Sequence, residues 1–405
     1  MTEPVAPPPI PAEAGVHQLP ASFGASPHVV PAAKRHKKRT GLLLTSLGIV
    51  VLGVACAGVQ LGANLGYDDA RVAFEAAADD AEEGQAQLTS ELTTLNSATS
   101  MASGIADVDS GMLMDAVSKE ALTAAITDAT AASTDATSLS EQLLPHADDK
   151  PDWAWELFGE TAQLNSDRDS ADQLVAEFSS AGDDASGATS SVEDAALTAV
   201  TTAADAAAGF EAVHVSARNL DILALRNAAD RVHGAATLDD AAQSAYSALE
   251  SAASQMLTSE QAELAEKSGA LYGARVEIEA FARSLAPGVL LDFDWSEIVN
   301  GYGYSDSMAG YATWWYADPG YATIELTNSV AALWPSARSE ALVAHEVGHA
   351  ISVKCEGMYD DSTQENIEAW GTAWAISMGY VDDANGTWAY GPPPQSLIDA
   401  AAGCR

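Results

Sequence analysis

Apolar residues recur at helical spacing through the middle of the chain, from about residue 64 to residue 286. Steps of three and four residues run through three stretches: Phe210, Val213, Ala217, Leu220 and Ala224; Tyr246, Leu249, Ala253 and Met256; and Leu271, Ala274, Ile278, Phe281 and Leu285. Such steps predict helices that pack along a narrow seam. Breaks near residues 97–104, 145–151, 182–187 and 234–239 suggest about five helices, in a folded-back bundle or an extended coiled-coil stalk. The Ala-rich seams also make this region the expected place of any self-association.

An uninterrupted apolar run precedes this helical region. Residues 41–63 carry no charge, and at about 1.5 Å per residue they extend roughly 34 Å, enough to cross the hydrocarbon core. The basic run 34–39 holds the N-terminal end in the cytoplasm. We therefore predict a single-pass membrane anchor over 41–63, with the C-terminal side outside the cytoplasm. Residues 1–40, rich in Pro and Ala, are expected to be a disordered cytoplasmic tail.

Two alternatives to an uncleaved anchor stay open. A basic run followed by an apolar core is also typical of a cleaved signal peptide, and Val54-Ala55-Cys56 is similar to a lipoprotein cleavage site that would be lipidated at Cys56. The anchor is favoured because Gly53 stands where the lipoprotein motif has Leu, and because the apolar run continues past Cys56.

The pattern changes near residue 287, where aromatic residues and alternation replace the helical spacing. Seven of the nine Trp follow this point, and aromatic bulk of this density builds a small core. Residues 321–327 alternate as a strand does, directly before a predicted helix. The Gly- and Tyr-rich run 301–321 is either a loop over a cleft or the turns of a hairpin. We therefore predict an α+β chain with a helical region over 64–286 and a small C-terminal domain over 287–405.

The net charge of the chain argues against negatively charged binding partners. The formal net charge is −40, and residues 1–40 hold five basic and two acidic residues, so the remainder carries −43. A surface this acidic repels nucleic acid and anionic lipid. We expect no nucleic-acid partner.

The candidate chemistry of the chain lies in His345-Glu346-Val347-Gly348-His349. Two His four residues apart lie one turn apart on the same face of a helix and can bind one metal ion, and Glu346 is a candidate general base. Zinc held by two His and a carboxylate keeps a position for water, whose pKa falls to about 7. Pro335 and Ser336 indicate where this helix begins.

The third ligand is expected to be a carboxylate, because no His follows His349. A second predicted helix, ended by Gly379, contains Glu365 and Glu368, and Asp360 and Asp361 lie just before it. Ser362 and Glu365 match a capping box, which would occupy the Glu365 carboxylate at the helix start. Glu368 is therefore the favoured ligand.

These residues resemble the gluzincins, the thermolysin-like zinc metallopeptidases in which two His come from one helix and a Glu from the next. The family's Glu-x-x-x-Asp pattern, followed by x-aromatic-Ala, is similar to Glu368 to Ala375 here, and the resemblance covers residues 321–379. It implies two site helices in a zincin-like domain, one zinc per chain on His345, His349 and Glu368, and a peptide or protein substrate. It also implies that strand 321–327 is an edge strand that pairs with substrate. The residues themselves fit equally well an ordinary strand that closes a small sheet, and both interpretations stay open. Thr372 departs from the pattern, because the family has there an Asp that orients the first His.

The remaining Cys and Tyr residues give two further predictions. Cys355 and Cys404 would face an oxidising exterior, so we expect them to form a disulfide. Because no downstream His is available to stabilise the oxyanion, a Tyr is considered for this role; Tyr359, Tyr380 and Tyr390 are candidates that the sequence does not rank.

The function expected from these patterns is a membrane-anchored extracytoplasmic zinc metallopeptidase with Glu346 as general base. One alternative is a cell-surface helical adhesion or scaffold protein with a degenerate peptidase domain. Another is a zinc hydrolase that acts on a non-peptide amide.

Overall fold

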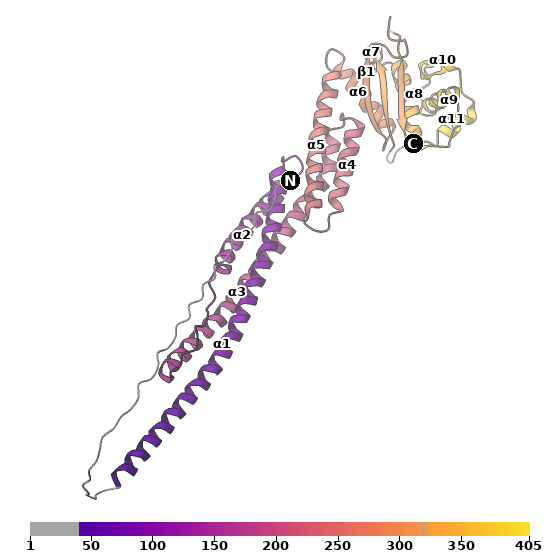
Figure 1. Cartoon of the computed structure of the whole chain (residues 1–405). Helices are drawn as coiled ribbons and strands as arrows, with labels where there is room; N and C mark the ends of the chain where they lie inside the picture. Colours follow the sequence, from indigo (N-terminus) through magenta and orange to yellow (C-terminus); the bar gives the residue numbers. More distant parts are fainter. Residues whose placement is uncertain (1–39, 306, 317–319) are drawn as a thin grey trace, which may run out of the picture.

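Three long helices form a rod that carries a smaller C-terminal unit at one end (Figure 1). The structure is a computed structural model that describes residues 40–305, 307–316 and 320–405, with side chains from residue 53 onward. The rod consists of α1 (Thr40–Val108), α2 (Ala116–Ser140) and α3 (Ala154–Val213). The described chain is mostly helical, with one three-stranded mixed sheet near the C-terminus.

The rod is held by heptad seams. Buried residues of α3 repeat at steps of seven, at Leu157, Leu164, Ala171, Phe178, Ala185 and Val192. Residues 63–74 of α1 pack on residues 154–164 of α3, and residues 77–81 pack on Ala171, so the two helices run parallel. The shorter α2 returns antiparallel to both and buries Leu122, Ala129 and Ala136. Steps of seven are typical of a coiled coil. The three helices thus fold back on one another as the bundle alternative expects, and the bundle is elongated into a rod.

Two of the predicted helix breaks are wrong. Helix α1 continues through residues 97–104, and α3 continues through residues 182–187. A single Gly inside a helix costs only about 1 kcal/mol, which an uninterrupted seam outweighs. The predicted breaks near 145–151 and 234–239 are confirmed, whereas the predicted run from Phe210 to Ala224 is interrupted between α3 and α4.

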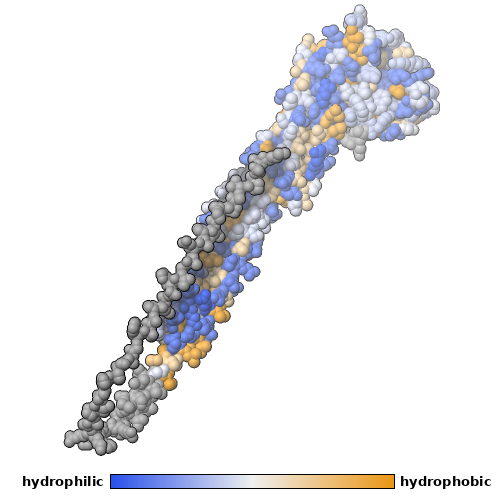
Figure 2. Space-filling view, viewed as in Figure 1, coloured by the Kyte–Doolittle hydropathy of each residue, from blue (hydrophilic) through white to orange (hydrophobic). Residues whose placement is uncertain are grey.

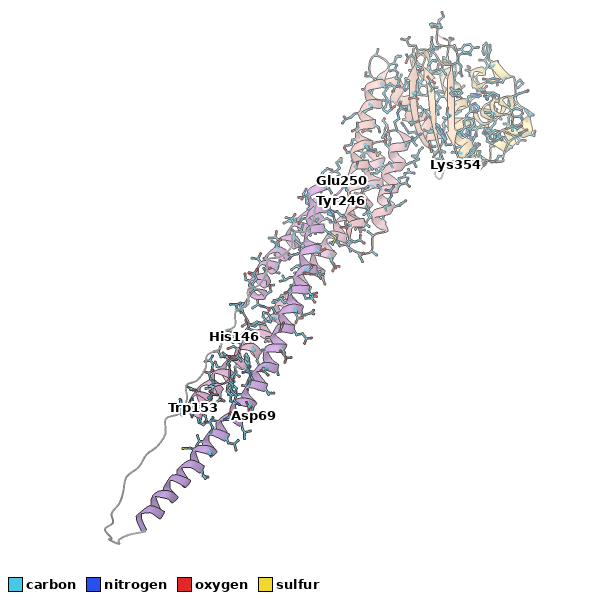
Figure 3. All side chains as sticks on the ribbon, in the orientation of Figure 1. Asp69, His146, Trp153, Tyr246, Glu250 and Lys354 are labelled. Carbon is cyan, nitrogen blue, oxygen red and sulfur yellow. A yellow bond between two sulfur atoms is a disulfide. The ribbon has the colours of Figure 1, made fainter. Side chains whose placement is uncertain are left out.

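Two further helices, α4 (Asn219–His233) and α5 (Asp240–Glu266), extend the rod and join it to the C-terminal unit. Their apolar faces belong to the same core cluster as the upper part of α1 and α3. Where α1 ends against α5, the Tyr246 hydroxyl donates to Glu250 Oε1 at 3.1 Å and to Asp109 Oδ1 at 3.2 Å (Figure 3). Burial raises the pKa of Tyr246, so this hydroxyl stays a donor at neutral pH.

Buried polar contacts fix the junction between the rod and the sheet. Asn219 Nδ2 donates to the Ala322 carbonyl at 2.8 Å, and the Asn219 N–H donates to Asp292 Oδ2 at 3.2 Å. Lys267 Nζ and Glu279 Oε2 form an ion pair at 2.7 Å between two side chains that are almost fully buried. Removing one partner of such an ion pair would leave an uncompensated buried charge. These polar contacts therefore fix how the rod and the sheet pack against each other.

The sheet contains β1 (Leu290–Ser296), β2 (Gly310–Trp315) and β3 (Tyr321–Thr327) in the order β1-β3-β2. Strand β3 pairs parallel with β1 and antiparallel with β2. The strand predicted at 321–327 is therefore confirmed. Of its two interpretations, the ordinary strand of a small sheet is confirmed and the edge strand is wrong. Because β1 comes from before the Gly-rich run and fills the other side of β3, the edge beside the site helix belongs to β2.

Short helices complete the C-terminal unit. They are α6 (Tyr272–Leu285), α7 (Asn328–Ala332), α8 (Ala337–Ala350), α9 (Gln364–Ser377), α10 (Thr387–Tyr390) and α11 (Gln395–Ala401), with 3-10 turns at Ile351–Lys354 and Asp383–Asn385. Trp370 and Trp374 are fully buried in the core between sheet and helices. Ile278 of α6 lies in the same core, which thus extends to the N-terminal side of residue 287.

The predicted disulfide is confirmed. Cys355 and Cys404 are bonded, with their Cα atoms 5.9 Å apart, and join the turn after α8 to the C-terminus. The Trp374 indole N–H donates to the Cys404 carbonyl at 2.9 Å, which ties α9 to the same point. Closing a loop of 49 residues adds about 4 kcal/mol of stability in the chain-entropy model.

The predicted anchor lies at the edge of what the structure describes. Tail residues 1–39 lie outside the described residues, and residues 40–52 are described by their helical backbone alone. Among the residues whose side chains are described, no helix has the length and hydropathy needed to cross a membrane.

Candidate metal site

Helix α8 carries the His-Glu-x-x-His residues and lies between β2 and α9. It begins where the sequence predicts, because the Ser336 hydroxyl caps it and accepts from the Ser339 N–H at 3.2 Å. His345, Glu346 and His349 occupy one face of its last turns and are at most 5% exposed. Groups that ionise are rarely buried this deeply unless they serve one another or a ligand.

Two glycines let α8 and α9 approach closely. A Cβ on Gly348 would lie 2.8 Å from the Gly371 carbonyl oxygen, and a Cβ on Gly371 would lie 2.8 Å from the His349 ring. A larger residue at position 348 would have to push α9 away, and one at position 371 would have to displace the His349 ring. This close crossing brings Glu368 of α9 to the two His of α8.

The start of α9 differs from the predicted capping box. Thr363 is the N-cap and accepts from the Asn366 N–H at 3.2 Å, while the Ser362 N–H donates to Asp360 Oδ1 at 3.0 Å. No described hydrogen bond joins Ser362 to Glu365, so the capping prediction is wrong. The helix begins one residue later, and an Asx turn at Asp360 replaces the box.

Three ligand atoms converge at the crossing of α8 and α9. Glu368 Oε2 lies 3.1 Å from His345 Nε2 and 3.3 Å from His349 Nε2, and the two Nε2 atoms are 3.1 Å apart. Zinc bonds of about 2.1 Å at tetrahedral angles separate two ligand atoms by roughly 3.4 Å. The His345, His349 and Glu368 donor set therefore fits one zinc ion, with a fourth position left for water.

The other carboxylates weighed as ligands lie elsewhere. Glu365, Asp360 and Asp361 are absent from the groups of described residues that could hold a metal ion. Burial by itself would raise the pKa of Glu368, but its hydrogen bonds with His345 and His349 lower that pKa below its usual range. Glu368 is thus ionised, as a zinc ligand must be.

A backbone carbonyl orients the first His. His345 Nδ1 donates to the Asn385 carbonyl at 2.9 Å, which leaves Nε2 as the metal-facing lone pair. Thr372 Oγ1 lies 3.4 Å from the same nitrogen and donates to the Glu368 carbonyl at 2.8 Å. The orienting role of the Asp that the gluzincin pattern has at position 372 thus falls here to a neutral carbonyl. His349 Nδ1 is buried without a hydrogen-bond partner among the described residues.

Glu346 lies beside the cluster formed by His345, His349 and Glu368, under Gly310, the first residue of β2. A Cβ on Gly310 would lie 2.5 Å from Glu346, so only glycine lets the strand pass over this carboxylate. Burial raises the pKa of Glu346 to about 7; the charge of Glu368 acts in the same direction and His345 opposes it. A carboxylate with this pKa exchanges protons readily near neutral pH.

Two cavities meet at the cluster. The larger, about 650 Å³, lies beside His345 and Glu346 and is lined further by Tyr302, Leu342 and Trp388. The smaller, about 110 Å³, lies over His349, Glu368, Ala312 and Trp314. Both share a set of lining residues: Asn300, Gly310, His345, Glu346 and Tyr390. The two cavities are therefore a larger and a smaller part of one cleft, which meet at the cluster.

Tyr390 is the one of the three candidate tyrosines that lines this cleft. Its ring stacks on His345 with centroids 6.1 Å apart. Burial raises the pKa of Tyr390 to about 12, with the charges of Glu368 and Glu346 adding to it, so its hydroxyl is a donor at neutral pH. Tyr359 stacks on Trp370 instead, and Tyr380 packs against Phe281.

Several site residues have no predictive signal or a weak one. The Asn385 carbonyl has none, because every residue carries this group. Strand β2 lies in the run 301–321, which alternates only briefly, yet its Trp314 stacks on His349 with the ring planes 5° apart. The signal that could have predicted this strand is the β-branched and aromatic residues of 311–315, which favour strands.

Comparison with known proteins adds no relative. No protein-family model, curated protein or solved structure matches this chain. The assignment of the site therefore rests on its own geometry and chemistry.

Proposed function

We propose that this chain is a membrane-anchored zinc metallopeptidase of the gluzincin type. The observation that carries the proposal is the convergence of two buried atoms, His345 Nε2 and His349 Nε2, with Oε2 of the partly buried Glu368, at 3.1 to 3.3 Å from one another and with Glu346 beside them. These three residues would hold one zinc ion per chain. When bound, the ion supplies a polarised water and a Lewis acid for the substrate carbonyl.

The residues of the cleft divide the remaining work. Glu346 takes the proton of the attacking water and passes it to the leaving amine, for which its raised pKa suits it. The Tyr390 hydroxyl donates a hydrogen bond to the carbonyl oxygen as negative charge develops there. The Asn385 carbonyl holds the His345 ring in place by its hydrogen bond to Nδ1.

The free edge of β2 suits an extended peptide. The Thr327 N–H donates to the Ala309 carbonyl at 3.0 Å across the β2–β3 pairing. Alternation then turns the backbone groups of Gly310, Ala312 and Trp314 away from β3, toward the cleft that these residues line. A peptide can add to this edge as a further strand, which supports a peptide over a non-peptide amide as substrate.

The location of the enzyme follows from the anchor and the disulfide. Residues 41–63 would cross the membrane with the N-terminus in the cytoplasm, and the Cys355–Cys404 bond supports an oxidising exterior for the C-terminal unit.

The rod favours a second candidate, a cell-surface helical scaffold with a degenerate peptidase domain. Helix α1 alone has 69 residues, far more than a catalytic unit needs. The two candidates differ in one measurable property, because a degenerate site would not bind zinc.

The test is metal analysis of the purified chain, joined to a peptide-library digest. We expect about one zinc per chain, with cleavage that stops on chelation and returns with zinc. A folded chain that binds no zinc would support the scaffold protein instead. A chain that binds zinc but cleaves only non-peptide amides would support the zinc hydrolase that acts on a non-peptide amide.

A further inference from the structure

Three large aromatic side chains are exposed together at the base of the rod. Trp153 is the N-cap of α3 and Trp155 lies in its first turn; they are 56% and 68% exposed, and their rings stack 5.2 Å apart and 7° from parallel. Phe158, three residues later, is 57% exposed. Figure 3 shows Trp153 in the lower part of the rod, where α3 begins beside α1, with α1 continuing below it; Figure 2 shows apolar surface in this part of the rod. An exposed apolar group of this size marks an interaction surface.

Hydrogen bonds fix this aromatic group at a defined level of α1. Gln60 Nε2 donates to the Asp152 carbonyl at 2.9 Å, and the Ala154 N–H donates to Gln60 Oε1 at 2.9 Å. The inner face of the same turn of α3 packs on α1 through Ala154 and Leu157. The aromatic group is therefore held beside Gln60 and turned outward.

The surroundings of α1 change at this level. On one side of Gln60, the seam with α3 begins at Ala63 and continues through Tyr67 and Ala70. On the other side, residues 53–59 are all exposed and include no polar residue except Cys56. A helix that is apolar on every side suits lipid rather than the one-sided seam of a partner helix.

The distance along α1 matches a bilayer. Of the proposed anchor 41–63, the 20 residues from residue 41 to Gln60 extend about 30 Å as a helix, the thickness of the hydrocarbon core. Residues 61–63 then lie beyond the core, where Ala63 begins the seam with α3. Trp side chains are enriched at the interface between hydrocarbon and water. Residues 148–156, which contain both Trp, carry four acidic side chains and one basic side chain, Lys150. Because the run is negative on balance, a zwitterionic headgroup layer suits it better than an anionic one.

We propose that Trp153, Trp155 and Phe158 dock in the outer interface of a zwitterionic bilayer, an inference that rests on the proposed anchor and on α1 leaving the membrane at this level. This contact adds a second attachment beside the anchor and prevents the rod from swinging freely about α1. From Gln60 to Val108, α1 alone extends about 70 Å toward the C-terminal unit. Helices α4 and α5 continue the rod beyond that point.

The proposal can be tested by fluorescence of the full chain in phosphatidylcholine vesicles. Phosphatidylcholine brominated on its acyl chains near the headgroup should quench part of the Trp emission. The double variant Trp153→Phe, Trp155→Phe should lose most of that quenching while keeping the helical content of the native chain. The matched control is Trp388→Phe, which removes an equally exposed Trp from the C-terminal unit and should leave the quenching unchanged.

Either of two results would overturn the proposal. One is equal emission in brominated and unbrominated vesicles from a native chain that co-floats with the vesicles, as expected if a second copy covers the aromatic group; a chain that does not co-float would instead count against the proposed anchor. The other is quenching that survives in the double variant, which would place another Trp at the lipid. The first result is measured on the native chain alone. It therefore stays decisive even if the double variant loses helical content.

Discussion

Replacing Glu368 by Gln tests the ligand set most directly. The change removes the negative charge but keeps the side-chain volume, and the amide can keep a hydrogen bond with Gln364, whose Nε2 lies 2.7 Å from Glu368 Oε1. Helix α9 should therefore stay folded, because its cap at Thr363 and its buried Trp370 are untouched. The expected loss is specific to the metal.

The size of that loss follows from what Glu368 contacts. Removing a group that only orients a metal ligand typically weakens binding 10- to 100-fold, and Glu368 is itself within 3.3 Å of both His. We expect zinc to bind at least about 100-fold more weakly, which corresponds to roughly 2.7 kcal/mol. Cleavage should disappear with the metal.

The matched control is Glu365→Gln on the same helix. Glu365 lies in the first turn of α9 and outside the cluster, so the loss of its charge near the helix N-terminus should cost at most about 1 kcal/mol of stability. Its zinc affinity should equal that of the native chain. Zinc dissociation constants from competition with a chelator measure both variants, and retained zinc in Glu368→Gln together with lost zinc in Glu365→Gln would refute the assignment.

Three further predictions concern the base, the oxyanion and the helix crossing. Glu346→Gln should keep its zinc while turnover falls by about 100-fold or more, because the proton acceptor is gone; near-normal turnover would exclude Glu346 as the base. Tyr390→Phe should lower kcat by about 100-fold with little change in KM, whereas Tyr380→Phe, away from the cleft, should match the native chain; equal rates for both variants would leave Tyr390 without a role. Gly371→Ala should lower the free energy of unfolding by about 1–3 kcal/mol and weaken zinc binding, because its Cβ meets the His349 ring. Gly187→Ala, in open space on α3, should instead stabilise by about 1 kcal/mol; chemical denaturation measures both, and a stable Gly371→Ala that binds zinc normally would contradict the close crossing.

Local geometry explains what the sequence by itself determined. The start of α8 at Ser336 and the strand at 321–327 depend on residues within a few positions of one another, and both are found where predicted. The spacing of His345 and His349 places two imidazoles on one face of any helix. The Cys355–Cys404 pairing followed from counting, since the other Cys lies in the apolar run.

Only the tertiary structure decided which surfaces meet. Whether a glycine ends a helix depends on the seam it faces, so Gly104 and Gly187 lie inside long helices. The central place of β3 depends on β1, which joins it in parallel from a distant part of the chain.

The same reason applies to the site. Tyr390 and the Asn385 carbonyl reach the cluster because α10 and the turn before it fold back onto α8. Periodicity carries no information about such a contact, and a backbone carbonyl has no residue type to recognise. The sequence thus determined the ligand-bearing helices one by one, while their crossing at Gly348 and Gly371, which brings the three ligand atoms together, is a property of packing.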